Sequence, residues 1–272
     1  MLLVCVSVDE YAGGIWNGPA DHSVAVAFNW HPTSLFLGVK VIDDSHQLNG
    51  ASGWNGDSVQ VVFTDDARTS VTHLYNYAWD AAGGTIVHHH ETGPGGTEAV
   101  VTRYDAAGGL DAATTYEIKI PATAWGLAAD GAQAGMTLGI GICVNDGDLD
   151  AGQGGQKGWS GWGPYAAVYG KTASAAGVVT FAADSPATCA SGTSAQVTQG
   201  ASALAQWTPA AMTRDATTGA FSGLTAECDG IAGATGCATM TYAAPMQTIT
   251  MDGDLGDWTT AGALMAQTAF LP

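Results

Sequence analysis

Basic residues are scarce in this chain: 7 Lys and Arg stand against 25 Asp and Glu, which gives a formal net charge of -18. A field of this sign repels phosphate groups, so nucleic acids and anionic membrane surfaces are poor partners. No apolar run reaches the roughly 18 residues that a membrane-spanning helix needs. The apolar start, residues 1–8, lacks a basic beginning and a cleavage site, so it does not resemble a signal peptide. Neutral sugars and divalent cations remain compatible with the composition.

Cysteine is also infrequent and shows neither the CxxC spacing nor the Cys/His spacing of zinc sites. Cys143 lies in an alternating apolar run and is predicted to be a buried free thiol. Cys228 and Cys237 flank a short Gly-rich loop, where a local disulfide would suit a secreted protein, although the sequence does not fix the pairing. The remaining cysteines are Cys5 and Cys189.

Signatures of catalysis are lacking as well. A glycoside hydrolase needs two carboxyl groups about 5–10 Å apart across the scissile bond. The spacing of the few glutamates singles out no such pair, and the Gly-x-Ser-x-Gly motif is absent. Glu117, for example, alternates with Tyr116 and Ile118 and is predicted to lie on an exposed strand face. The sequence therefore predicts a protein without intrinsic catalytic activity.

Short segments with period-2 alternation dominate residues 1–184. Val24, Val26 and Phe28 alternate with small or polar residues, and similar patterns cover residues 35–41, 59–63, 116–120 and 138–144. Such alternation between turns predicts an all-β fold, an antiparallel, jelly-roll-like β-sandwich. Residues 185–245 are rich in Ser, Thr, Ala and Gly and are predicted to form a linker. Residues 246–272 resume an ordered pattern, which we interpret as the beginning of a second, similar module.

Two tryptophan-rich stretches stand out, Ser52-Gly-Trp-Asn-Gly-Asp-Ser-Val-Gln60 and Gly158-Trp-Ser-Gly-Trp-Gly-Pro164. Glycine neighbours give an aromatic ring little to pack against, so these rings are candidates for faces that stay open to a ligand. An indole face is flat and amphipathic, and it can bury the C–H groups of a sugar ring. Trp30, Trp79 and Trp125 follow ordinary packing patterns and are predicted to be structural.

Several motifs together resemble those of carbohydrate-binding module family 9, whose members accompany xylanases. The chain has Asn29-Trp-His-Pro-Thr-Ser-Leu-Phe-Leu-Gly-Val-Lys-Val-Ile-Asp-Asp44, then Trp54-Asn-Gly-Asp-Ser-Val-Gln60 and Tyr116-Glu-Ile-Lys-Ile-Pro121. The family's opening turn resembles Thr250-Met-Asp-Gly-Asp-Leu-Gly-Asp-Trp258, near the C-terminus. From this order we expect a first module that lacks its opening strand, followed by the start of a second copy.

The resemblance implies a sugar slot walled by Trp54 and by Trp159 or Trp162, with polar groups at its edge. Gln60 stands where the family has a binding carboxylate, and Asn76 is a further candidate. The implied ligand is a chain end of xylan or β-glucan, and the implied role is to target a larger secreted or cell-surface protein, such as a glycoside hydrolase acting on xylan, to polysaccharide. We therefore also expect covalently linked neighbouring domains. The alternatives are a structural or adhesive module of a surface or filament protein, and part of a glycoside hydrolase.

Aspartates on turns are candidates for a structural calcium site, which the family resemblance also implies. Calcium prefers hard oxygen ligands, which Asp43, Asp44, Asp146, Asp148 and Asp150 could supply. The alternative is a solvated acidic turn. Asp57 is predicted to cap backbone N–H groups instead. The run of histidines at residues 88–90 follows a strand pattern, so adjacent rings point to opposite faces and cannot converge on one ion.

Overall fold

The computed structural model describes residues 9–10, 17–18, 20–47, 53–80, 85–108, 111–147, 155–183, 213–214, 221–222, 241–258 and 265–266. Most of the predicted linker, together with Cys5, Cys189, Cys228, Cys237, Asp148 and Asp150, lies outside these residues. The side chains of residues 80–90, which include the three consecutive histidines, also lie outside the description. No helix in the described part of the chain is long and apolar enough to cross a bilayer.

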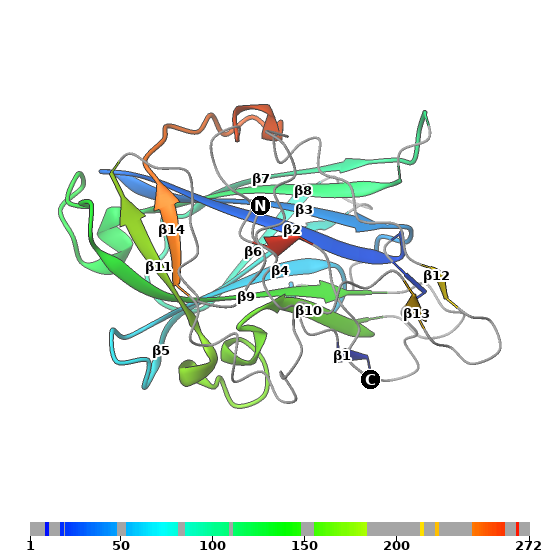
Figure 1. The fold of residues 1–272 in the computed structure, drawn as a ribbon, viewed down its shortest axis with the longest axis horizontal. Helices are drawn as coiled ribbons and strands as arrows, with labels where there is room; N and C mark the ends of the chain where they lie inside the picture. The colour runs from blue at the N-terminus through cyan, green and yellow to red at the C-terminus, as the bar shows by residue number, and fades with distance from the viewer. Residues whose placement is uncertain are drawn as a thin grey trace.

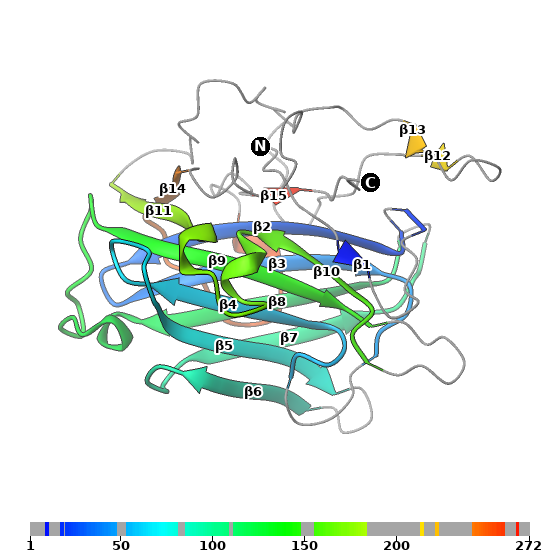
Figure 2. The same ribbon diagram turned by 90° about the horizontal axis from the view of Figure 1, so that it is seen from below.

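Two sheets form the body of the molecule and stack as layers (Figures 1 and 2). Sheet 1 has the order β1-β10-β9-β4-β5-β6, and β11 joins it beside β9. Its strands are β1 (Asp9–Glu10), β4 (Ser58–Thr64), β5 (Val71–Asp80), β6 (Thr85–Thr92), β9 (Thr137–Asp146), β10 (Gly158–Trp162) and β11 (Gly177–Ala182). Their mutual pairings are antiparallel.

Sheet 2 has the order β15-β2-β3-β8-β7 and is antiparallel throughout. Its strands are β2 (His22–His31), β3 (Ser34–Asp43), β7 (Glu98–Tyr104), β8 (Ala113–Pro121) and β15 (Met265–Ala266). A separate hairpin pairs β12 (Thr213–Arg214) with β13 (Phe221–Ser222). The short 3-10 turns are η1 (Ala122–Trp125), η2 (Pro164–Ala166), η3 (Ala173–Ala175) and η6 (Leu255–Asp257). The prediction of an antiparallel β-sandwich is confirmed.

The core lies between the sheets and follows from the alternation in sequence. On β2, Val24, Val26 and Phe28 point inward, and they meet Val59, Val61 and other inward residues from sheet 1. The prediction that Trp30 is structural is confirmed, since its ring stacks on Phe181 with centroids 5.1 Å apart. Trp79 and Trp125 pack against the same core. Cys143 is a buried thiol outside any disulfide, as predicted.

Residues 241–258 are part of this body rather than separate from it. Strand β14 (Thr241–Pro245), within the predicted linker, pairs in parallel with β11 and extends sheet 1 (Figure 1). Residues 246–258 then continue onto sheet 2, where Met246 bridges to Trp30.

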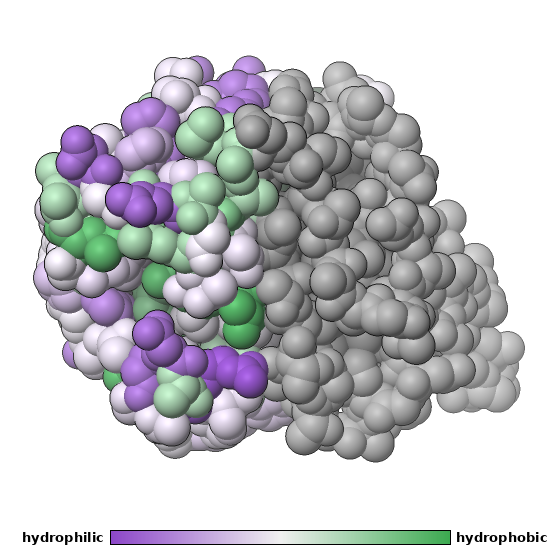
Figure 3. Space-filling model, turned by 60° about the vertical axis from the view of Figure 1, so that its left-hand side comes forward, coloured by the Kyte–Doolittle hydropathy of each residue, from purple (hydrophilic) through white to green (hydrophobic). Residues whose placement is uncertain are grey.

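Figure 3 brings forward the end of the sandwich at the left of Figure 1, where hydrophilic and hydrophobic residues intermingle on the surface.

The position of Glu117 differs from the exposed one that the sequence predicts. Alternation does direct it away from the core between the sheets, but its side chain is buried and not exposed. The reason is that residues 252–258 cover this face of sheet 2, and their N–H groups donate to the Glu117 carboxylate.

Candidate functional site

The outward face of sheet 1 carries a cavity of about 430 Å³. Its lining comes from the loop before β4, from strands β4, β6 and β10, and from the turn after η2. The lining residues are Trp54, Gln60, Glu91, Gln156, Trp159, Ala167, Val168, Tyr169 and Lys171. Three of the predicted sugar-binding residues, Trp54, Gln60 and Trp159, are therefore brought together.

Trp54 offers an open indole surface in this cavity. It lies in the turn before β4, and 42% of its surface is exposed, although it is among the largest apolar side chains of the chain. A single exposed apolar side chain is ordinary on a protein surface, but one that lines a cavity offers a ligand an apolar face. Neighbouring Gly53 and Gly56 have positive φ angles of 75° and 145°, conformations that glycine adopts readily.

Trp159 has a different position from the one predicted. It is only 1% exposed, and its ring meets the edges of Tyr165, with centroids 5.1 Å apart at 90°, and of Tyr169, at 6.4 Å and 63°. Its ring therefore packs against two tyrosines and is buried where it lines the cavity. Tyr169, by contrast, is 69% exposed and stands at the rim.

Trp162 is not part of the cavity, and its assignment to the sugar slot is wrong. Its side chain is fully buried in the core between the sheets, 6.3 Å from Phe28 between ring centroids. The physical reason is that residues 158–162 form strand β10 and not a loop. Residues three apart on a strand point to opposite faces, so Trp159 faces outward and Trp162 inward.

The polar floor of the cavity follows from strand register. Gln60 on β4 pairs with Asn76 on β5 and with Cys143 on β9, so the three side chains share the outward face. The Gln60 amide donates to Asn145 Oδ1 at 3.2 Å, and Asn145 donates to Ser58 Oγ at 2.8 Å. These bonds fix the orientation of the Gln60 amide. Asn76 is fully buried, donates to Glu91 Oε1 at 3.3 Å and does not line the cavity.

Two charged residues at the rim, Glu91 and Lys171, were not predicted from the sequence to belong to the site. Glu91 lies where the β5–β6 register shifts, between the pairs Leu74–Thr92 and Tyr75–His90. Such a bulge redirects a side chain, here toward Asn76. Lys171 has a φ of 58°, and its Nζ lies 3.6 Å from Glu91 Oε2 and donates to the Ala167 carbonyl at 2.7 Å. Neither a bulge nor a left-handed turn produces a regular pattern of residue types, so the sequence does not reveal these two positions.

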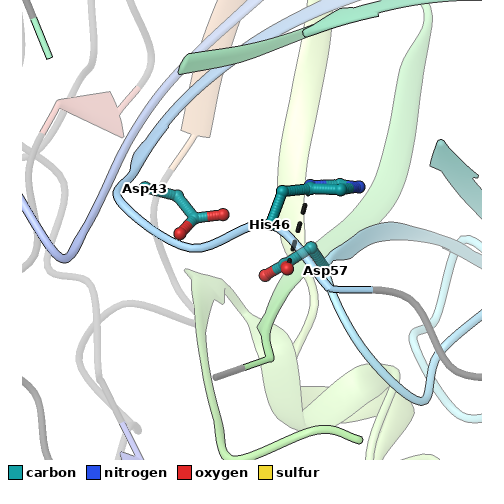
Figure 4. A group of neighbouring side chains, drawn as sticks. All are labelled: Asp43, His46 and Asp57. Atoms are coloured by element: carbon teal, nitrogen blue, oxygen red, sulfur yellow. Dashed lines mark ion pairs between the residues drawn. The ribbon is translucent and has the colours of Figure 1, made fainter. Parts of the chain in front are cut away.

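A second group of polar side chains lies where β3, β4 and β9 meet. Ligand atoms of Asp43, His46 and Asp57 all lie within 4.8 Å of one another, and Figure 4 shows the three side chains as one group, with an ion pair drawn between His46 and Asp57. Asp57 accepts hydrogen bonds from the backbone N–H groups of Gln47 and Gly147, as predicted for a capping residue. Of the other predicted calcium ligands in the described residues, Asp44 is exposed and Asp146 is buried.

Burial and mutual repulsion weaken the acidity of these carboxyl groups. Burial raises the pKa of Asp43 to about 6, a shift that Asp146 adds to and that Ser45 N–H and Arg103 oppose. Burial, and then the charges of Asp43 and Asp146, raise the pKa of Asp57. Asp146 has a partner of its own, since its Oδ1 lies 3.5 Å from His22 Nδ1. A divalent cation would relieve the remaining repulsion between Asp43 and Asp57.

The sequence model of the carbohydrate family 9 binding domain-like family matches residues 5–182 of this chain. The chain belongs to this family. The matched range covers both strands that carry the cavity's predicted residues, β4 and β10. This class of domain binds carbohydrate and is not catalytic, which agrees with the expectation that the domain is not an enzyme.

Two solved structures that match the chain are carbohydrate-binding modules of family 9. One from Caldicellulosiruptor kristjanssonii, in complex with glucose, is 12% identical, with a TM-score of 0.42 over 65% of this chain and 83% of that one. Another from the same organism, in complex with cellotriose, is 12% identical, with a TM-score of 0.40 over 58% of this chain and 72% of that one. No curated protein matches the chain.

Proposed function

We propose that the cavity on sheet 1 binds one sugar ring of a xylan or β-glucan chain, with a terminal residue preferred. The carrying observation is that an exposed Trp54 shares a cavity of about 430 Å³ with oriented amide and charged groups. Ligand sites commonly combine an apolar surface with a few placed polar groups in this way. The glucose and cellotriose in the complexes of the two similar structures support a glucan ligand.

Each lining residue offers the sugar a contact that suits the chemistry of its side chain. The Trp54 indole offers a face to the C–H groups of the ring, and Tyr169 supplies a second exposed aromatic surface. Gln60 and Gln156 present amides, while Glu91 and Lys171 present charged acceptors and donors for hydroxyl groups. The role that follows is to hold a larger extracellular protein on polysaccharide, and a linked second binding domain would raise its avidity.

Titration with oligosaccharides tests the proposal directly. Tryptophan fluorescence of the full chain is followed while glucose, cello-oligosaccharides or xylo-oligosaccharides are added. We expect a saturable change with at least one series, because the sugar would cover Trp54. A flat response at millimolar concentrations of every sugar would instead favour the structural or adhesive module, and release of reducing ends would favour a hydrolase.

The charged rim provides a matched pair of variants. Glu91→Gln removes a charged acceptor from the cavity, and we expect it to weaken oligosaccharide binding roughly tenfold, or about 1.4 kcal/mol. Glu98→Gln is the control, since Glu98 is also exposed and also pairs with a lysine, Lys119 at 2.9 Å, but on sheet 2. Exposed ion pairs contribute little to folding, so neither change should alter the melting temperature. Isothermal titration calorimetry measures the affinities, and equal affinities for the two variants would exclude Glu91 from the site.

We also propose that Asp43 and Asp57 bind a structural calcium ion. Asp43 Oδ2 is buried and accepts no hydrogen bond, although Arg103 Nη1 lies 3.6 Å away, and His46 Nδ1 lies 3.8 Å from Asp57 Oδ2. Calcium takes oxygen ligands, so the two carboxylates would hold it and the imidazole would not. The ion would join the turn after β3 to the start of β4, next to the loop that carries Trp54.

Removal of calcium tests this site. Adding calcium at about a hundred times its dissociation constant would stabilise the fold by about 2.7 kcal/mol, a rise in melting temperature of roughly 5–10 °C over chelator. Asp43→Asn should abolish the rise, whereas Asp44→Asn, on the exposed neighbour, should keep it. Differential scanning calorimetry with calcium, magnesium or chelator gives the result. Identical melting in all three buffers would count against a calcium site.

A further inference from the structure

The segment formed by residues 246–258 packs against the outer face of sheet 2. Ile249, Leu255 and Trp258 are buried there, and Trp258 is fully covered. Their partners on the sheet are Ala25, Ala27, Phe36, Ile42 and Ala113. The alternation that sends Val24 and Val26 into the core turns Ala25 and Ala27 outward, and their small side chains leave room for the segment.

Glu117 anchors the segment through its carboxylate. Its Oε2 accepts from the backbone N–H groups of Asp252 at 2.9 Å and Gly253 at 2.6 Å. Its Oε1 accepts from the indole N–H of Trp258 at 3.0 Å. Hydrogen bonds to a charged acceptor are stronger than those between neutral groups. One buried carboxylate on β8 thus binds both ends of the turn 252–258.

Gly253 fits against β7 and β8 with little space to spare. Its carbonyl accepts from Tyr104 Oη at 3.2 Å and Thr115 Oγ1 at 3.3 Å. A Cβ at this position would lie 2.6 Å from Thr102 Oγ1, and its φ is +86°, so both the contact and the backbone require glycine. Within the turn, Asp254 accepts from Gly256 N–H at 2.9 Å and caps η6.

We infer that residues 246–258 are a closing element of this same sandwich, and that sheet 2 carries a receptor surface for them centred on Glu117. The sequence pattern alone suggested the start of another module. The family match ends at residue 182, so this element comes from outside the matched range. The occupant of the surface is the chain's own segment, because its buried apolar side chains, two of its backbone N–H groups and the Trp258 indole N–H all meet partners on sheet 2. The inference does not depend on sugar binding.

A cysteine pair tests which segment occupies the surface. The Cβ positions of residues 102 and 253 lie 3.8 Å apart, within the range of a disulfide. In the full chain carrying Thr102→Cys and Gly253→Cys, we expect mild oxidation to link the two residues within one molecule. Mass spectrometry of peptides under non-reducing conditions identifies the link, and the two single variants are controls. A link between two molecules would overturn the inference, since the surface would then hold another copy's segment.

Hydrogen exchange gives a second measurement without strain at residue 253. In the wild-type chain the amides of Asp252 and Gly253 should exchange slowly, because Glu117 accepts from both. Glu117→Gln should speed their exchange at least tenfold, while Glu98→Gln on the neighbouring strand should leave it unchanged. Fast exchange of both amides in the wild type would overturn the inference even if the cysteine pair fails to oxidise.

Discussion

Replacing Trp54 with alanine is expected to weaken oligosaccharide binding by about a hundredfold while the melting temperature stays constant. The expected loss is large because the indole is a large apolar surface in the cavity and is 42% open. A stacked sugar would bury much of that area, and the alanine variant offers none of it. Stability should change by less than ~0.5 kcal/mol, as for other substitutions away from the core.

Two further variants separate stacking from a general effect of truncation. Trp54→Phe keeps a smaller aromatic face and should lose only about tenfold in affinity. Met246→Ala shortens another large apolar side chain of similar exposure, 48%, which lies outside the cavity, and it should bind as the wild type does. Because Trp54 variants lose the fluorescence signal, calorimetry measures the affinities. Wild-type affinity in Trp54→Ala would refute stacking on this residue.

Much of the fold was predictable because period-2 alternation depends only on local residue order. Val24, Val26 and Phe28, or Tyr116 and Ile118, show in sequence which way each strand faces. The exposure of Trp54 was predictable for a similar reason. Its glycine neighbours mark a turn, and an indole in a turn has few residues to pack against.

The remaining parts of the site depend on contacts between distant residues. The outward direction of Glu91 arises from a register shift between β5 and β6, which is a property of the pair and not of either strand. Tyr169 and Lys171 reach the rim through left-handed backbone, with φ angles of 40° and 58°. Tyrosine and lysine rarely adopt this conformation, so their residue types do not predict it. Glu117 is buried only because a segment far along the chain covers it. The prediction for Trp162 is wrong because residues 158–162 form a strand, on which Trp159 and Trp162 point to opposite faces.

Trp162 should behave in the opposite way to Trp54. Its ring is fully buried and lies against Gly177, where an added Cβ would come within 2.1 Å of the indole. Trp162→Ala would leave a large cavity between the sheets, and we expect the free energy of unfolding to fall by about 3–5 kcal/mol. That loss is a large part of the roughly 5–15 kcal/mol that holds a typical domain folded. The sugar affinity of the molecules that remain folded should be close to that of the wild type.

Trp162→Phe makes this contrast measurable if the alanine variant does not fold. The indole N–H of Trp162 has no hydrogen-bond partner, so phenylalanine gives up volume but no polar contact. We therefore expect a smaller loss, about 1–2 kcal/mol, because part of the ring volume is kept. Urea unfolding gives the stability, and calorimetry below the unfolding transition gives the affinity. A stable Trp162→Phe variant with greatly reduced sugar affinity would indicate that Trp162 contacts the sugar, and it would contradict the orientation of β10. Lower stability with unchanged affinity would establish that the two tryptophan-rich stretches serve separate ends, one facing the ligand and the other holding the two sheets together.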